Sequence, residues 1–89
     1  MTEEQPQRLS IQWSEEARAD LRRIERPLAL DILYCIDRFS SSHAGDIKKL
    51  KPPLTGYRLR CGDYRIFFDR SGEFSIQILA VRNRKEAYR

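Results

Sequence analysis

Three consecutive segments in the second half of the chain alternate apolar and polar side chains, and this pattern constrains the fold most. The segments are residues 57–61, 64–69 and 74–81, with turn residues at Gly62–Asp63 and Ser71–Gly72 between them. Alternation with a period of two between tight turns is typical of β-hairpins. The second half of the chain therefore predicts an antiparallel meander of three strands.

The first half predicts one short strand and two amphipathic helices. Residues 9–13 alternate as a strand does, and Ser14 is a typical N-cap for a helix over residues 15–25. Pro27 fits the first turn of a second helix, whose apolar stripe ends near Phe39. The acids of the first helix are interpreted as surface residues matched to the helix dipole; they are Glu15, Glu16 and Asp20.

The segment of residues 40–53, between the second helix and the meander, is rich in turn residues. It begins with a serine run and ends at Pro52–Pro53. Such residues favour turns and interrupt regular elements, so we expect a loop or a frayed helix end here. The segment also carries three lysines, Lys48, Lys49 and Lys51.

The chain of 89 residues is long enough for one hydrophobic core and is expected to form a single domain over residues 1–89. The predicted order is β-α-α-β-β-β. We expect an α+β fold in which two N-terminal helices pack on one face of a small, largely antiparallel, four-stranded sheet. Residues 1–8 are polar, and we expect them to be flexible.

Alternation also predicts which side chains face the helices. The expected core residues of the meander are Leu59, Cys61, Ile66 and Phe68. Arg58, Arg60 and Arg65 then lie on the opposite, open face, which becomes cationic. An ordinary solvated sheet face is the alternative interpretation of these arginines.

Composition narrows the class of protein. Hydrophobic residues make up 40% of the chain and charged residues 34%, and no apolar run approaches the roughly 20 residues that a bilayer span needs. The first residues lack the pattern of a secretory signal, so a cytoplasmic location is expected. The net charge of +4 favours a polyanionic or acidic partner, although this charge is weak support by itself.

The two cysteines, Cys35 and Cys61, are far apart and have neither Cys-x-x-Cys nor histidine spacing. We therefore expect no metal and no disulfide, and interpret both as buried free thiols. The single histidine, His43, lies in the serine-rich segment and is expected to be solvated rather than catalytic.

The richest motifs are L-T-G-Y-R-L-R-C-G-D-Y-R-I-F-F at residues 54–68 and V-R-N-R-K-E-A-Y-R at residues 81–89. They closely resemble the RelE/ParE family of toxins, with its patterns L-x-G-Y-R-L-R-x-G-D-Y-R-I and V-x-H-R-x-x-x-Y. The resemblance runs in order from Trp13 to Tyr88. As a resemblance it implies a toxin of a type II toxin–antitoxin pair.

The resemblance implies the activity and the partners. RelE-like members cut messenger RNA in the ribosomal decoding site, ParE-like members poison DNA gyrase, and both are held inactive by an antitoxin. We expect a ribosome-dependent endoribonuclease that works through the RNA 2'-hydroxyl without metal or small-molecule cofactor. The expected partners are a cognate antitoxin, the ribosome and messenger RNA, with no membrane. A gyrase inhibitor and a degenerate toxin that binds only its antitoxin are the alternatives.

The resemblance also implies the site. The residues that match RelE-like catalytic positions are Arg58, Arg60, Arg65, Arg84 and Tyr88. Further candidates for RNA binding are Lys48, Lys49, Lys51, Tyr57, Tyr64, Arg82 and Lys85. Arginine forks bind phosphate oxygens and tyrosine rings stack on bases. For the two tyrosines a packing role, and for the three lysines a merely solvated position, are the alternatives.

The sequence departs from the family pattern where a proton acceptor would be needed. Asn83 stands where many relatives have histidine, and Arg58 and Arg60 stand where RelE has lysines. An arginine stays protonated near neutrality and is a poor general base. Without a histidine or lysine at these positions, two hypotheses remain. The site acts by electrostatic stabilisation alone, or Asp63 or Glu86 serves as the base.

Overall fold

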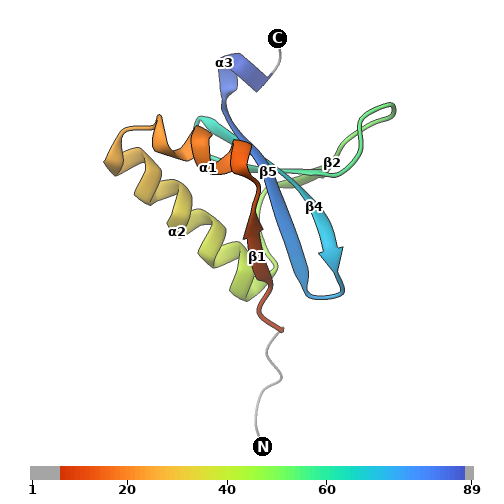
Figure 1. The fold of residues 1–89 in the computed structure, drawn as a ribbon. Helices are drawn as coiled ribbons and strands as arrows, with labels where there is room; N and C mark the ends of the chain where they lie inside the picture. Colours follow the sequence, from red (N-terminus) through yellow and green to blue (C-terminus); the bar gives the residue numbers. More distant parts are fainter. Residues whose placement is uncertain (1–6, 88–89) are drawn as a thin grey trace, which may run out of the picture.

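The computed structural model describes residues 7–87, so Tyr88 and most of the segment predicted to be flexible lie outside the described residues. The elements in chain order are β1 (Ser10–Trp13), α1 (Glu15–Arg22), α2 (Arg26–Ser42), β2 (Ile47–Lys49), β3 (Tyr57–Cys61), β4 (Tyr64–Gly72), β5 (Ser75–Asn83) and α3 (Arg84–Ala87). Figure 1 shows α1 and α2 together on one side of the sheet. The predicted α+β class is confirmed.

The sheet contains five strands in the order β1-β5-β4-β3-β2, rather than the four that were predicted. The meander of β3, β4 and β5 is antiparallel as expected, and β1 pairs with β5 in parallel. The additional strand β2 falls in the segment expected to be a loop or a frayed helix end. It pairs with β3 and places Ile47 opposite Leu59, where Ile47 packs against the core. Pairing with the free edge of β3 thus outweighs the turn propensity of the residues in this segment.

The two long helices have the predicted starts but different ends. Ser14 caps α1 by accepting a hydrogen bond from the Ala17 N–H at 3.1 Å. That helix ends at Arg22, three residues earlier than predicted, because its last turn tightens into i to i−3 hydrogen bonds. Pro27 lies in the first turn of α2, which continues three residues beyond Phe39. Within residues 7–87, no helix is both long enough and apolar enough to cross a membrane.

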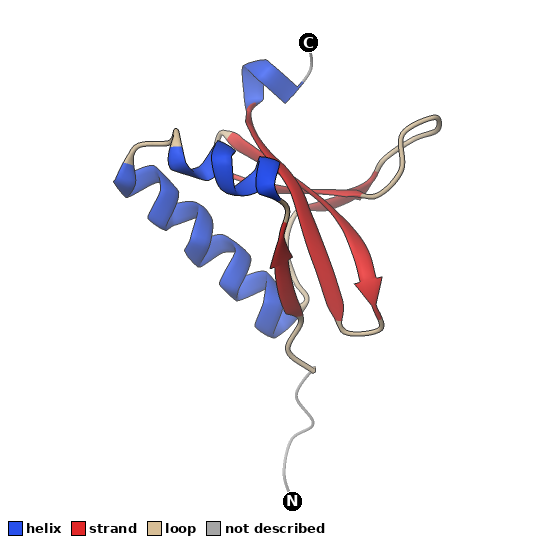
Figure 2. Ribbon diagram, in the orientation of Figure 1, coloured by secondary structure: helices blue, strands red, loops and turns tan. Residues whose placement is uncertain are grey.

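The hydrophobic core lies between the helices and one face of the sheet (Figure 2). All four side chains predicted for the core face of the meander are buried there: Leu59, Cys61, Ile66 and Phe68. Phe39 from α2 meets Phe68 from β4 with ring centroids 5.5 Å apart. The period-two pattern therefore placed the core face of the meander correctly.

Cys35 and Cys61 form a disulfide, so the prediction of two free thiols was wrong. The core packing of α2 on β3 brings their Cα atoms to 6.1 Å, a separation that a disulfide spans readily. Their 26-residue separation in sequence carried no signal of this contact, because it depends on the crossing of a helix over a strand.

Candidate nucleic-acid interface

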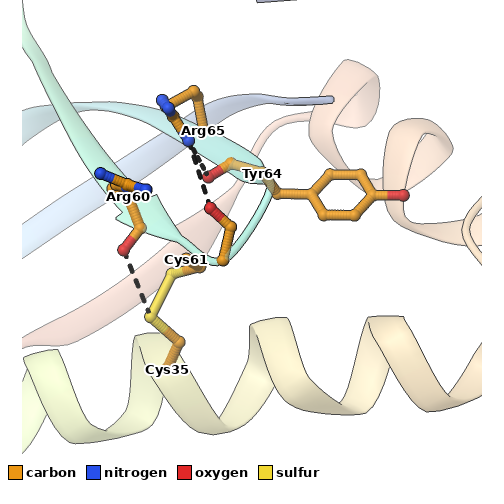
Figure 3. The surroundings of a disulfide bond; sticks show 6 residues. Cys35, Arg60, Cys61, Tyr64 and Arg65 are labelled. Carbon is orange, nitrogen blue, oxygen red and sulfur yellow. Dashed lines mark hydrogen bonds between the residues drawn. A yellow bond between two sulfur atoms is a disulfide. The ribbon is translucent and has the colours of Figure 1, made fainter. Parts of the chain in front are cut away.

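Three arginines form a row across the open face of the sheet. Arg60 on β3 lies opposite Arg65 on β4, and Arg65 lies opposite Arg82 on β5. Figure 3 shows Arg60 and Arg65 projecting on the side of the β3–β4 hairpin away from α2, whereas Cys61 points toward α2. Like charges directly opposite one another on a sheet are destabilising. The arginine row therefore needs anions nearby, from the protein or from a ligand.

Arg65 is the central and least satisfied member of the arginine row. Its residue surface is only 6% exposed. Its Nη1 donates to the main-chain oxygens of Gly62 and Tyr64, each at 3.3 Å, but its Nε has no hydrogen-bond partner. None of the ion pairs among residues 7–87 includes Arg65. Burying a charge without a counter-charge is costly, so this side chain is poised for an anion.

Arg82, at the β5 end of the row, has acidic partners on α1. Its guanidinium pairs with Glu16 at 2.5 Å and with Asp20 at 3.5 Å. The interpretation of Asp20 as a surface residue was wrong, because its side chain is 3% exposed. Asp20 Oδ2 accepts a hydrogen bond from the Val81 N–H at 2.9 Å. These contacts leave Arg82 largely neutralised compared with Arg65.

Arg60 and Arg58 extend the positive surface along β3. Arg60 lies 3.9 Å from Asp46, and both side chains are more than half exposed, so this pair is weak. Arg58 lies two residues before Arg60 and opposite Lys48 on β2, which puts Lys48 on the same open face. Lys49 is opposite Tyr57 and belongs to the other face. Lys51 is exposed in the following loop.

The two predicted RNA-stacking tyrosines belong to the face of the sheet opposite to the arginine row. Tyr57 packs on the core side against Phe68, with ring centroids 5.5 Å apart and an interplanar angle of 18°. Tyr64 projects away from Arg65 (Figure 3) and lines a cleft of about 740 Å³ on the helix side of the sheet. The contact of Tyr57 with Phe68 supports the packing alternative for that residue.

The remaining predicted site residues among those that the structure describes, Arg84 and Lys85, lie at the cleft beside Tyr64. Arg84 and Lys85 line it together with Arg23, the C-cap of α1. The Arg84 N–H donates to the main-chain oxygen of Asp63 at 2.7 Å, which attaches the start of α3 to the β3–β4 turn. Arg84 therefore begins α3 beside the turn, and the residue lines the helix-side cleft. Tyr88 lies outside the described residues.

Asn83, which stands where many relatives have histidine, has a structural role. Its Oδ1 accepts a hydrogen bond from the Lys85 N–H at 3.1 Å, so the side chain caps α3. Asparagine is among the best N-cap residues. Within the described residues, the position of a possible base is thus occupied by a helix cap.

Sequence reasoning missed the acids that neutralise one end of the arginine row. Asp20 lies three residues after Ala17 and four before Ile24, so it falls on the apolar face of α1. That spacing could have indicated that Asp20 is buried. In residues 7–87, no group of three or more His, Cys, Asp or Glu side chains is arranged to hold a metal ion.

Comparison with protein families gives a match over residues 11–88 to the model described as ParE toxin of type II toxin-antitoxin system, parDE. A comparison with curated proteins found no match. The family match covers the open-face arginines and the C-terminal motif alike.

Solved structures share the fold. The toxin–antitoxin complex RelBE2 from Mycobacterium tuberculosis matches with a TM-score of 0.76 and 22% identity over 85% of this chain and 91% of that chain. The RelB–RelE complex from Methanococcus jannaschii matches with a TM-score of 0.67 and 24% identity over 86% and 94% of the two chains. The YoeB dimer from Staphylococcus aureus matches with a TM-score of 0.59 and 27% identity over 84% and 95%.

Proposed function

Because the chain belongs to the ParE toxin family of type II toxin–antitoxin systems, we propose that this toxin inhibits translation by cleaving messenger RNA on the ribosome. The observation that carries the proposal is the buried Arg65, which lacks an acidic partner among the described residues and lies between Arg60 and Arg82. A phosphodiester would supply the missing anion. Arginine is well suited to it because its planar fork binds two phosphate oxygens at once.

The proposed reaction is attack by the RNA 2'-oxygen on the adjacent phosphorus. The bond to the 5'-oxygen breaks, the proton of the 2'-hydroxyl is lost and a proton reaches the leaving 5'-oxygen. Negative charge grows on the non-bridging oxygens as the phosphorus becomes five-coordinate. In this scheme Arg65 donates to those oxygens, and Arg58 and Arg60 hold the neighbouring phosphates. Preorganised donors of this kind typically contribute about 100-fold to 1,000-fold in rate.

The end of the sheet would hold the leaving group in the same scheme. Arg84 begins α3 directly beside the β3–β4 turn, and its main-chain contact with Asp63 fixes that position. We propose that Arg84 stabilises the leaving oxygen and that Tyr88 stacks on a base. Exposed Lys48 and Lys51 would contact phosphates more loosely and strengthen the salt dependence of binding. No step in this scheme requires a metal.

The partner that restrains the toxin is proposed to be an acidic or amphipathic antitoxin. Structures similar in fold include RelBE2 and RelB–RelE complexes, in which a toxin of this fold is bound to its antitoxin. An acidic segment laid over the arginine row would place carboxylates where the phosphates bind, and so would compete with RNA.

Inhibition of DNA gyrase is the second candidate function, and one observation favours it. Asn83 caps α3 and has no ionisable proton. The single histidine, His43, is the C-cap of α2 and lines a pocket with Phe39 and Tyr57. The carboxyl-bearing Asp63 lines one cleft with Arg84 and another with Arg60, so it remains a candidate base in the nuclease scheme. A protein that only binds gyrase would need no general base. Glu86 remains the other candidate base in the nuclease scheme.

Induced expression in bacterial cells distinguishes the two functions. Primer extension on abundant messages would detect cuts, and plasmid supercoiling would report on gyrase. We expect discrete cuts within translated codons for the wild type and none for Arg65→Ala. Arg70→Ala is the matched control, because Arg70 lies on the same strand, is exposed, and is outside the arginine row.

The outcomes separate cleanly. Intact messages with blocked supercoiling would replace the nuclease by the gyrase inhibitor. If messages stay intact and supercoiling is normal, the remaining interpretation is a protein that only binds its antitoxin. Cleavage by a Glu86→Gln variant at the wild-type rate would remove Glu86 as the base.

A further inference from the structure

The disulfide joins α2 to the end of β3 at the point where the candidate site begins. Cys35 lies in the middle of α2, and Cys61 is the last residue of β3, directly before the turn at Gly62 and Asp63. Cys35 Sγ also lies 3.9 Å from the main-chain oxygen of Arg60 (Figure 3). The crosslink therefore fixes the strand that carries Arg60 immediately next to the turn.

That turn positions the two arginines on which the proposed chemistry depends. The main-chain oxygen of Gly62 accepts from Arg65 Nη1 at 3.3 Å, and the main-chain oxygen of Asp63 accepts from the Arg84 N–H at 2.7 Å. Any movement of the turn relative to the sheet would displace both donors. Arg65 and Arg84 thus share one support.

The packing between the turn and α2 is incomplete. A cleft of about 360 Å³ separates them, lined on the helix side by Leu28 and Asp31 and on the turn side by Gly62 and Asp63. Leu28 is 43% exposed, so it does not close the gap by packing. The disulfide lines the same cleft. It is the covalent connection across this cleft.

We propose that Cys35 and Cys61 are positioning residues whose bond is a thiol–disulfide switch for the toxin. When the bond is closed, the turn holds Arg65 and Arg84 in place for an RNA phosphate; when it is open, the turn moves and the site loses its alignment. Opening consumes one dithiol reductant: the protein disulfide becomes two thiols, and the reductant becomes a disulfide. A low-molecular-weight disulfide, reduced to two thiols, closes the bond again.

The environment of the proposed target makes both states accessible. Ribosomes work where thiols are kept reduced, and disulfides in that setting are mostly transient, catalytic or redox-sensing. The switch would then raise toxin activity when the thiol pool becomes oxidised. Its activity readout rests on the proposed function, but its effect on the turn does not.

Amide hydrogen exchange tests the effect on the turn. The purified full-length chain is compared after oxidised glutathione and after dithiothreitol, together with a Cys35→Ala/Cys61→Ala variant under both conditions. We expect reduction to lower the protection of the Arg84 amide far more than that of the Ile78 and Val81 amides, whose protection should fall only with the global free energy of unfolding. The double variant should match the reduced protein in both conditions and thereby control for direct effects of the reagents.

Cleavage of a short message on purified ribosomes gives the second readout. We expect reduction to slow the single-turnover rate by about tenfold or more, because misplacement of a catalytic group by about 1 Å costs up to about 100-fold. Addition of oxidised glutathione should restore the rate for the wild type and leave the double variant slow.

Three results would overturn the switch. They are equal protection of the Arg84 amide in the two states, a loss of protection at Arg84 no larger than the loss at Ile78 and Val81, and equal cleavage rates before and after reduction. The second result would mean that the crosslink holds the whole fold rather than the turn. Cleavage in neither state would count against the nuclease alone, and the exchange experiment would still decide whether the turn is switched.

Discussion

The two ends of the arginine row are held in place by different chemistry. At the β5 end, α1 supplies polar side chains: Ser14 Oγ donates to the Leu79 oxygen at 3.1 Å, and Asp20 accepts from the Val81 N–H. At the β3–β4 end, a disulfide and main-chain oxygens fix the turn. The first end neutralises Arg82, whereas the second leaves Arg65 without an acid. Since the fold does provide acids beside the row, the lack of an acidic partner for the buried Arg65 is a local feature of the turn.

The largest difference between the two ends should appear in activity. We expect Arg65→Ala to lower the rate of message cleavage by about 100-fold or more, because a preorganised donor to the phosphate is lost. Arg82→Ala should lower it by less than about tenfold, because Glu16 and Asp20 already neutralise that guanidinium. Single-turnover cleavage on purified ribosomes measures both. Equal losses would show that the row acts as one unit and would remove the distinction.

The covalent support of the turn should be visible in stability. Removing the crosslink with Cys35→Ala/Cys61→Ala is expected to lower the free energy of unfolding by about 3.5 kcal/mol, from the entropy of a loop with a sequence separation of 26. Urea denaturation of the variant and of the oxidised and reduced wild type measures this. The reduced wild type should match the variant. An unchanged denaturation midpoint would contradict the expectation.

The polar support of the β5 end should be nearly as important. Asp20→Ala would leave the buried Val81 N–H without its acceptor and Arg82 without its buried partner. We expect a loss of about 3 kcal/mol in the free energy of unfolding. Glu15→Ala is the matched control on the same helix, because Glu15 is exposed, and should change stability by less than about 0.5 kcal/mol. Similar effects of the two substitutions would refute a structural role for Asp20.

The smallest effect is expected at Asn83, which caps α3 beside the turn. Asn83→Ala removes the acceptor for the Lys85 N–H and should cost about 1 kcal/mol, whereas Asn83→Ser should retain most of the cap. Hydrogen exchange at the Lys85 amide would report the loss. If Asn83→Ala instead abolishes cleavage while exchange is unchanged, Asn83 contributes to the chemistry rather than to the helix.

Much of the fold could be predicted because it depends on local patterns. The alternation around Leu59 and Ile66 gave the core face, and the turn residues gave the antiparallel meander. The strand β2 could not be predicted in this way, because three residues that include Lys48 and Lys49 have no strand signal of their own. They become a strand only because β3 offers an edge with which to pair.

The placement of the candidate arginines on the sheet was predicted, but their surroundings were not. Alternation put Arg58, Arg60 and Arg65 on the open face, and the register confirms that Arg60 and Arg65 are neighbours. The burial of Arg65 and the pairing of Arg82 with Asp20 depend on tertiary contacts. Asp20 and Arg82 are 62 positions apart in the sequence. The disulfide was missed for the same reason. The period of the sequence pattern predicts which face of the sheet a side chain occupies, but not which groups it contacts there.

The hydrogen bonds that Ser14 and Asp20 make with the edge of β5 have a consequence for solubility. The strand β1 is four residues long and covers only the first part of the nine-residue β5, so the remaining edge would present free N–H and C=O groups. Ser14 Oγ donates a hydrogen bond to the Leu79 C=O, and Asp20 accepts one from the Val81 N–H, so these two groups are satisfied. Exposed strand edges are templates for edge-to-edge aggregation, and at the opposite edge of the sheet the exposed Lys48 and Lys49 oppose it by charge. A chain that loses Asp20 should therefore be found increasingly in the insoluble fraction, even where its fold survives.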